Sequence, residues 1–203
     1  MYIVIEGQDA TGKSTQVEML AEYLREQGKE VVTMHEPDGN TPSAETLRDL
    51  IKNKKYNLEP ITHVLLFTAA RAELWKKSAE PILKRGGVVI SARNWWSTLA
   101  YQGYGQGVSR DKIIRLTKQI MPKEYVEPDK SVILTLDEKE RLKRQGHRDN
   151  NSNQDTFESK SSDFQHRVDN AYLKIAKQFE IDTYDAKATP EEIQEDLRKL
   201  FEL

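Results

Sequence analysis

Short apolar runs alternate along this chain with longer segments in which apolar residues recur every three or four positions. Runs of four or five mostly apolar residues are typical of buried strands, and the wider spacing is typical of amphipathic helices. The predicted strands cover residues 2–5, 31–34, 88–92, 132–136 and 181–184. Because strands and helices alternate, we expect one α/β domain over residues 1–203: a doubly wound three-layer fold with a five-stranded parallel sheet flanked by helices.

Local residue preferences place several helix ends. Thr41 followed by Pro42 is typical of an N-cap and a first helical position, and Ser109 is a second candidate cap. Gly28 is a plausible end for the first helix. Residues 189–192 (Thr-Pro-Glu-Glu) form a capping box, which predicts a C-terminal helix.

Residues 60–84 are predicted to form one long helix that ends at Gly86-Gly87. The first half of this helix is apolar on nearly all sides, so we expect it to be deeply buried. Farther along, Gly103, Gly105 and Gly107 predict a loop.

A polar stretch separates the fourth strand from the last long helix. Residues 145–156 have no apolar periodicity, and they follow a short predicted helix that runs through Leu142. This composition indicates a mobile loop, and we expect a flexible lid over about residues 143–157.

The overall composition excludes several classes of protein. The net charge of −2 gives no strong attraction to nucleic acid or to an anionic membrane, so we expect neither as a partner. The absence of cysteine excludes disulfides, thiolate catalysis and cysteine-based zinc sites. The chain has no signal-peptide pattern and no apolar run long enough to span a bilayer, which predicts a cytoplasmic protein.

Candidate chemistry begins directly after the first strand, where residues 7–14 (Gly-Gln-Asp-Ala-Thr-Gly-Lys-Ser) match the phosphate-binding pattern G-x-x-x-x-G-K-[ST]. A strand–loop–helix unit directs backbone N–H groups and a helix N-terminus at an anion. Lys13 is expected to contact the β- and γ-phosphates, and the Ser14 hydroxyl to face Mg²⁺. The predicted nucleotide-binding residues are Gly7, Ala10, Thr11, Gly12, Lys13, Ser14 and Thr15.

A phosphate loop alone leaves ATPases, GTPases and kinases open. The chain lacks an Asn-Lys-x-Asp guanine-reading motif, which disfavours a GTPase. The small size and single domain favour a kinase of nucleotides or other small molecules. Phosphoryl transfer would then require cationic side chains near the strand ends and a basic lid.

Several further segments occur together and in a fixed order. They are Glu6-Gly7-x-Asp9, Glu36-Pro37-x-Gly39-x-Thr41, Leu66-Phe67-x-x-x-Arg71, Arg93 followed by Ala100-Tyr101-Gln102-Gly103, and Pro128-Asp129. With the phosphate loop, this ordered set resembles the thymidylate kinase family over nearly the whole chain. The resemblance implies transfer of the γ-phosphoryl group of ATP to dTMP with Mg²⁺ and, as is usual in that family, a homodimer.

The resemblance also implies roles for individual residues. Asp9 would meet the acceptor's 3′-hydroxyl and help to place the metal. Phe67 would lie against the thymine ring, and Arg71 would meet its carbonyl edge. Arg48 and Arg93 would hold the acceptor phosphate, because a guanidinium fork matches phosphate oxygens. The other predicted acceptor-site residues are Glu36, Pro37, Thr98, Tyr101 and Gln102.

The residues alone also allow plainer interpretations. Phe67 and Tyr101 could be core residues, and Arg48 could lie on the surface. Arg71 differs, because an arginine on an apolar helix is costly to bury without a partner. Residues 95 and 96, both tryptophan, are expected to serve packing or, together with the helix over 60–84, the dimer surface.

The lid is the expected source of further catalytic arginines. One subtype of the family carries an arginine in the phosphate loop, where this chain has Ala10, and the other supplies arginines from the lid. We therefore expect Arg144 and Arg148 to neutralise the transferred phosphoryl group, although a solvated basic turn is the alternative. Glu158 matches an acidic family position near the acceptor. The predicted catalytic residues are Asp9, Lys13, Arg93, Arg144 and Arg148.

One position departs from the family pattern. At the end of the third strand, the family normally has an aspartate that helps to hold Mg²⁺ through water, and this chain has Ala92. Either Ser14, Asp9 and the nucleotide phosphates suffice for the metal, or Asp137 or Glu36 substitutes, or the chain binds nucleotides but transfers phosphate poorly. A kinase for another deoxynucleoside monophosphate is a further alternative.

Overall fold

The computed structural model describes residues 1–37, 41–148, 157 and 161–203, with side chains for all of these except 147 and 148. Its strands form one sheet in the order β2-β3-β1-β4-β5, and every neighbouring pair is parallel. The strands are β1 (Tyr2–Gly7), β2 (Val31–His35), β3 (Val88–Ala92), β4 (Lys130–Thr135) and β5 (Asp182–Asp185). The predicted five-stranded parallel sheet is confirmed.

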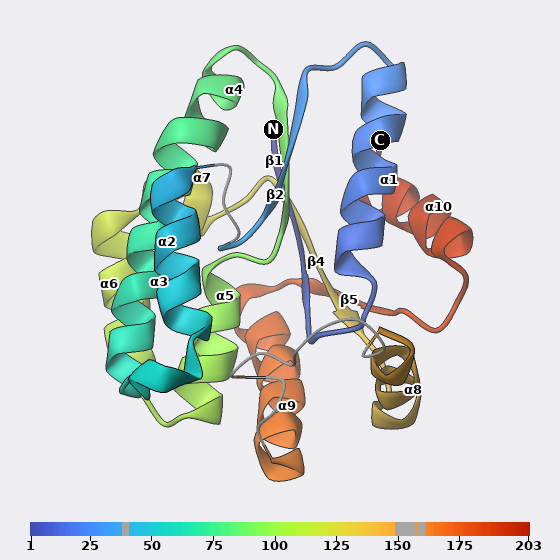
Figure 1. Ribbon diagram of the computed structural model, residues 1–203. Helices are drawn as coiled ribbons and strands as arrows, with labels where there is room; N and C mark the ends of the chain where they lie inside the picture. The colour runs from blue at the N-terminus through green and yellow to red at the C-terminus, as the bar shows by residue number, and fades with distance from the viewer. Residues whose placement is uncertain (38–40, 149–156, 158–160) are drawn as a thin grey trace.

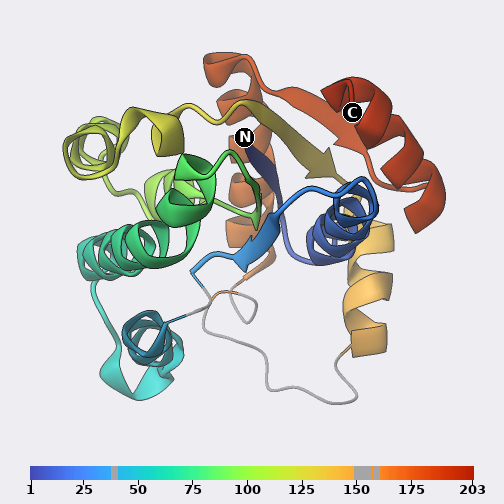
Figure 2. The same ribbon diagram turned by 90° about the horizontal axis from the view of Figure 1, so that it is seen from above.

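Helices cover both faces of this sheet, which gives the expected three layers (Figures 1 and 2). On one face, α1 (Lys13–Glu26) and α10 (Pro190–Phe201) pack against Ile3 and Ile5 of the central strand. No helix among the described residues is long and apolar enough to cross a membrane.

The opposite face carries a larger set of helices (Figure 1). They are α2 (Pro42–Lys52), α3 (Pro60–Leu74), α4 (Glu80–Lys84), α5 (Trp95–Thr98), α6 (Arg110–Ile120), α7 (Lys123–Val126) and α9 (Ser162–Phe179). A short 3₁₀ helix covers Lys54–Tyr56, and α8 (Glu138–Arg148) follows β4. Tyr2 and Val4 point into this second core, so alternate residues of β1 serve the two faces.

The predicted helix starts are confirmed by their hydrogen bonds. Thr41 Oγ1 accepts from the backbone N–H of Ala44 at 3.2 Å, with Pro42 at the first helical position. Thr189 and Glu192 form the expected reciprocal capping box at the start of α10.

The expectation of one buried helix over residues 60–84 is wrong in two respects. A π-helical segment, Trp75–Ala79, interrupts it between α3 and α4. Ile61 and Leu65 on the predicted buried half are 45% and 52% exposed. A helix in an outer layer keeps one side toward solvent, and an apolar sequence does not change that geometry.

The glycine loop is wrong for Gly103 and Gly105, although Gly107 lies outside the helix as expected, and packing is the one of the two expected roles of the tryptophans that is confirmed. Gly103 and Gly105 lie inside a second π-helical segment, Leu99–Gly105. A Cβ on Gly105 would lie only 2.6 Å from the ring of Phe164, so close packing with α9, rather than a turn, explains this glycine. Trp95 and Trp96 are buried in the core and therefore contribute no dimer surface.

Helix α8 is longer than predicted, since it continues to Arg148, so the first residues of the predicted lid are helical. The segment is rich in good helix formers, and an ion pair between Glu140 and Arg144, one turn apart, supports it. The remainder of the predicted lid lies outside the described residues, except for Phe157.

Candidate active site

The phosphate loop joins β1 to α1 at the carboxyl edge of the sheet. Gly12 at the start of α1 has a left-handed φ of 93°, and Ala10 has a φ of 65°. No side chain caps α1, and its first turn contains no acidic residue. An uncapped helix start has N–H groups available for an anion, which fits the predicted phosphate-binding role.

Several loop residues shape the backbone. A Cβ on Gly7 would lie 2.3 Å from the carbonyl oxygen of Leu134 on β4, so only glycine permits this approach. Thr11 Oγ1 donates to the Gln8 carbonyl at 2.9 Å, and Lys13 Nζ donates to the same oxygen at 2.6 Å. Thr15 is exposed on α1.

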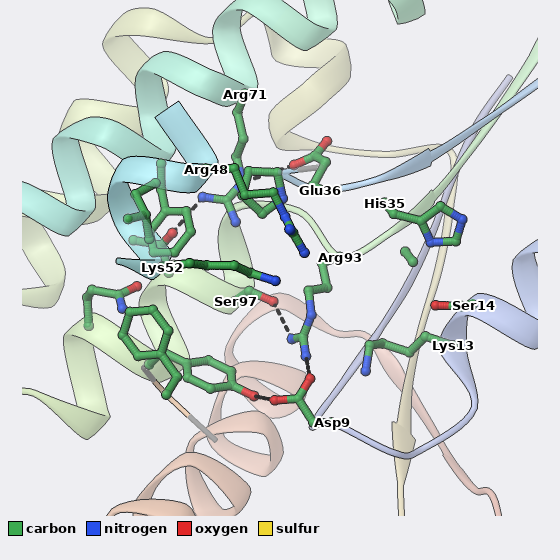
Figure 3. Close-up of a pocket in the computed structure, with 18 of the residues that line it drawn as sticks. Asp9, Lys13, Ser14, His35, Glu36, Arg48, Lys52, Arg71, Arg93 and Ser97 are labelled. Atoms are coloured by element: carbon green, nitrogen blue, oxygen red, sulfur yellow. Dashed lines mark hydrogen bonds and ion pairs between the residues drawn. The ribbon is translucent and has the colours of Figure 1, made fainter. Parts of the chain in front are cut away.

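A cavity of about 240 Å³ opens beside this loop, where β1, β2 and β3 end (Figure 3). It is lined by most of the predicted site residues: Asp9, Ala10, Gly12, Lys13, Ser14, Glu36, Pro37, Arg48, Phe67, Arg71, Arg93, Thr98, Tyr101 and Gln102. The fold thus brings together side chains from the phosphate loop, α2, α3 and the segment after β3.

Asp9 and Arg93 form an ion pair on the wall of this cavity (Figure 3). The Tyr101 hydroxyl donates to the other oxygen of Asp9 at 2.9 Å. Burial opposes ionisation of Asp9, but Arg93 and Lys13 outweigh that effect and lower its pKa to about 2. Asp9 is therefore a carboxylate at neutral pH. A carboxylate offers about four acceptor positions, so it has capacity for a substrate hydroxyl as well.

Arg93 is held by a buried network that sequence reasoning missed. Its Nη1 donates to Gly7 O, Ser97 Oγ and Tyr172 OH at 3.0–3.1 Å. Both of the latter hydroxyls also donate to the fully buried carboxylate of Glu6. Arg93 itself has a φ of 75°, a conformation uncommon for a side-chain-bearing residue and often found at functional sites.

A second buried network surrounds Arg71. Its Nε donates to Glu36 Oε2 at 2.9 Å, and its Nη1 donates to Thr98 Oγ1 at 2.6 Å. Tyr125 OH donates to the same Glu36 oxygen at 2.7 Å. Burial raises the pKa of Glu36 to about 7, although Arg71 acts in the opposite direction. Glu36 is thus the partner that Arg71 was expected to need in order to be buried. The Arg71 guanidinium also lies 5.3 Å from the centre of the Phe67 ring.

Phe157, Lys52 and His35 line the cavity as well, and sequence reasoning named none of them as site residues. The Phe157 ring lies 6.0 Å from the rings of Phe67 and Tyr101. An isolated aromatic in a polar stretch was the available signal for Phe157. No sequence signal distinguished Lys52 from the exposed lysines that follow it.

Ala92 lies beside the phosphate loop, in register with His35 on the neighbouring strand. His35 Nε2 lies 3.1 Å from Glu18 on α1. The two carboxylates considered as replacements for the missing aspartate have other partners: Glu36 bonds Arg71 and Tyr125, and Asp137 pairs with Lys187. Asp9 is paired as well, but Asp9 and Ser14 belong to the phosphate loop and line the cavity, and for that reason we retain the proposal that these two residues and the nucleotide phosphates suffice.

Arg144 is not among the described residues that line the cavity. Its guanidinium donates to Glu140 Oε1 at 3.2 Å and to the carbonyl oxygen of Ala186 at 2.9 Å. The side chain of Arg148 and the whole of Glu158 lie outside the described residues. The catalytic roles of the arginines stay predictions.

A parallel sheet with a phosphate loop at its carboxyl edge and a cation-lined cavity beside that loop defines a P-loop kinase that acts on a small phosphorylated acceptor. A family model for thymidylate kinase matches residues 5–197. The chain is 37% identical over 201 residues to a thymidylate kinase of Chlorobaculum parvum, covering 95% of this chain and 91% of that protein. This chain belongs to the thymidylate kinase family.

Two further similarities extend over the full length. A thymidylate kinase of Caldicellulosiruptor saccharolyticus is 35% identical over 205 residues, covering 99% of this chain and 95% of that protein. The crystal structure of thymidylate kinase from Ehrlichia chaffeensis superposes with a TM-score of 0.78 at 30% identity, covering 100% of this chain and 98% of that chain.

Proposed function

We propose that this protein transfers the γ-phosphoryl group of ATP to dTMP, giving dTDP for the synthesis of dTTP. The observation that carries this proposal is the continuous cavity that joins Lys13 of the phosphate loop to Phe67 and Arg71 on α3. An aromatic face suits a pyrimidine base, and a guanidinium held at Nε and Nη1 keeps further donors for its carbonyl edge.

The transfer would be a direct in-line displacement. A phosphate oxygen of dTMP attacks the γ-phosphorus, the bond to the β-phosphate oxygen breaks, and ADP leaves. Lys13 and the start of α1 would hold the donor phosphates, and Arg48 and Arg93 the acceptor phosphate. The Asp9 carboxylate would accept a hydrogen bond from the 3′-hydroxyl of dTMP, and its ion pair with Arg93 would keep that side chain in position.

Mg²⁺ is part of the proposal. Mg²⁺ prefers oxygen ligands, keeps several bound waters and is held largely by substrate phosphates, so it needs few protein ligands. The Ser14 hydroxyl at the uncapped start of α1 and the nearby Asp9 carboxylate would supply suitable oxygens. When bound, it would neutralise charge on the phosphates.

We also propose a homodimer, through α3 as expected but with α6 in place of the tryptophan pair. Ile61 and Leu65 on α3 are exposed, and Ile120 on the adjacent α6 is 49% exposed. An exposed apolar group of this kind is typical of an interface. The cytoplasmic location stays a prediction.

A coupled ADP-release assay with a panel of deoxynucleoside monophosphates tests the proposed function. We expect turnover with dTMP well above that with dCMP, dGMP and dAMP, and we expect Lys13→Ala to reduce kcat by about 100-fold or more, because it removes a charge that stabilises the transferred phosphoryl group. Lys29→Ala, on the surface, is the matched control. Equal turnover across the panel would refute the assignment of dTMP.

A further inference from the structure

The hydroxyl of Tyr172, on α9, lies between Arg93 and the buried carboxylate of Glu6. Tyr172 is 2% exposed, and it is not among the described residues that line the cavity. Arg93 Nη1 donates to the Tyr172 hydroxyl at 3.1 Å, and this hydroxyl donates to Glu6 Oε2 at 3.1 Å. The Tyr172 ring also packs edge-on against Tyr101, with 6.5 Å between the ring centres. A residue outside the cavity thus contacts, through its hydroxyl, a cation that lines it.

The hydrogen bonds of this network run in one direction. A guanidinium can only donate, so the Tyr172 oxygen accepts from Arg93 and directs its single hydrogen toward Glu6 or Ser97. Burial raises the pKa of Tyr172 well above its ordinary value, so the hydroxyl keeps this hydrogen at neutral pH. Glu6 is fixed in turn, because its two oxygens accept three backbone N–H groups at 2.7–3.1 Å. The Tyr172 hydroxyl is therefore an acceptor with a fixed position.

These contacts determine which edge of the Arg93 guanidinium is available to a ligand. Nη1 donates to Gly7 O, Ser97 Oγ and Tyr172 OH, and Nη2 donates to Asp9. Figure 3 shows the guanidinium between Ser97 and Asp9. A guanidinium has five N–H donors, so among the described residues these bonds leave Nε–H and one hydrogen of Nη2. Nε and Nη2 lie along one edge of the planar group, and such an edge matches two oxygens of a phosphate.

We propose that Tyr172 is a positioning residue for phosphoryl transfer: its hydroxyl holds the Arg93 guanidinium so that the Nε–Nη2 edge faces the 5′-phosphate of the acceptor nucleotide. This inference rests on the proposed function. Without the hydroxyl, Arg93 keeps its ion pair with Asp9 and two acceptors for Nη1, but the guanidinium gains freedom to turn. Because transfer requires the acceptor phosphate to be in line with the donor, a small displacement of this cation is costly.

A purely structural role for the hydroxyl predicts a different pattern of binding. The hydroxyl also joins α9 to β1 through Glu6, and in a structural role its loss loosens the fold. A loosened site binds dTMP and thymidine less well to the same extent. A displaced Arg93 affects dTMP selectively, because thymidine has no phosphate for that cation to bind.

The test is a calorimetric titration of dTMP and of thymidine into wild-type protein, Tyr172→Phe and Tyr184→Phe. Phenylalanine keeps the ring and its packing against Tyr101, and it removes only the hydroxyl. We expect Tyr172→Phe to weaken dTMP binding about tenfold, the upper range for one net hydrogen bond, and to leave thymidine binding unchanged. Tyr184→Phe is the matched control, since it removes an exposed hydroxyl that donates to Asp196 at 2.7 Å, and it should change neither affinity.

A further pair of variants tests whether Tyr172 acts through Arg93. In an Arg93→Lys background, Tyr172→Phe should have no additional effect on dTMP affinity, because the guanidinium that it positions is gone. The same loss in that background would overturn the inference, as would unchanged dTMP binding or an equal loss for dTMP and thymidine. If the wild type itself binds neither compound, the proposed function fails instead.

Discussion

Glu36 links Arg71, the side chain proposed to meet the base, to the pH of the solution. It is buried, bonds Arg71 and Tyr125, and its pKa is raised to about 7 by burial. The folded protein therefore keeps this proton to a higher pH than the unfolded chain does. By linkage, the contribution of the protonated Glu36 to the free energy of unfolding is fully present below the unfolded pKa of 4.5. It is lost as the pH rises through the folded pKa of about 7.

We predict that the free energy of unfolding falls between pH 5 and about 7.5, by up to about 3 kcal/mol from this group. Glu36→Gln should flatten the decline, because the amide stays neutral and its oxygen still accepts from Arg71. Urea unfolding at a series of pH values measures this. Glu30→Gln is the control, since Glu30 is exposed and its pKa is lowered by the Arg85 hydrogen bond. Parallel pH profiles for Glu36→Gln and wild type would contradict the expectation.

The alanine at position 92 leads to a prediction about the Mg²⁺ concentration that turnover requires. A carboxylate at this position would lie beside the phosphate loop, next to His35 in register. We expect Ala92→Asp to lower the Mg²⁺ concentration for half-maximal turnover by about tenfold, because it adds a negative charge close to the cation. Ala92→Asn has nearly the same size without the charge. Identical magnesium titrations for the two variants would show that charge at this position is unimportant.

Sequence reasoning identified some residues of the candidate site and missed others. The two groups differ in whether a local sequence motif marks them. Lys13, Asp9, Arg71 and Arg93 belong to short motifs, and they were found for that reason. Glu6 belongs to the same motif as Asp9, but its contacts with Ser97 and Tyr172 lie 91 and 166 residues away and were not predicted. No local pattern contains such a pairing, so a buried carboxylate of this kind becomes visible only in the folded chain.

At the scale of elements, the π-helical segment over Leu99–Gly105 connects the core to the acceptor site. Gly105 packs against Phe164 of α9, and the Phe164 ring lies 6.2 Å from the ring of Tyr101, which bonds Asp9. The packing of α9 against this segment thus supports the position of a predicted substrate-binding side chain.

Gly105→Ala should therefore cost both stability and substrate affinity. The added methyl group would lie 2.6 Å from Phe164 Cε2, and overpacking of this kind typically costs about 1–3 kcal/mol. Thermal unfolding and the KM for dTMP measure the two effects. Gly146→Ala on α8 is the control, since a Cβ there has no neighbour within 4 Å and alanine favours the helix. Equal stability of the two variants would contradict the prediction.

Element types and ends were predictable where the physical cause is local. Strands follow from apolar runs, and the caps Thr41 and Thr189 follow from their own side chains. The two π-helical segments were not predictable, because their geometry depends on packing against distant parts of the chain. The exposed flank of α3 was missed for the same reason.

At the scale of the whole molecule, we propose that the exposed apolar side chains of α3 and α6 form the contact between two copies of the chain. We predict that Leu65→Glu converts a dimer into a monomer, because a charge would be buried at the centre of the interface. Sedimentation analysis measures the change. Leu173→Glu on α9 is the control, with a leucine that is equally exposed on another part of the surface. A wild-type monomer, or a Leu65→Glu dimer, would refute the proposed surface.

The strand order has a consequence for how the chain is made. The phosphate loop follows β1, which precedes the other four strands in the sequence, yet β1 occupies the middle of the sheet between β3 and β4. A nascent chain from which β3 has emerged but β4 has not therefore displays one open edge of β1, a strand that is fully buried in the folded protein. We expect ribosome-bound intermediates to recruit chaperones until β4 emerges, since long-range parallel pairing is slow and unpaired edges aggregate.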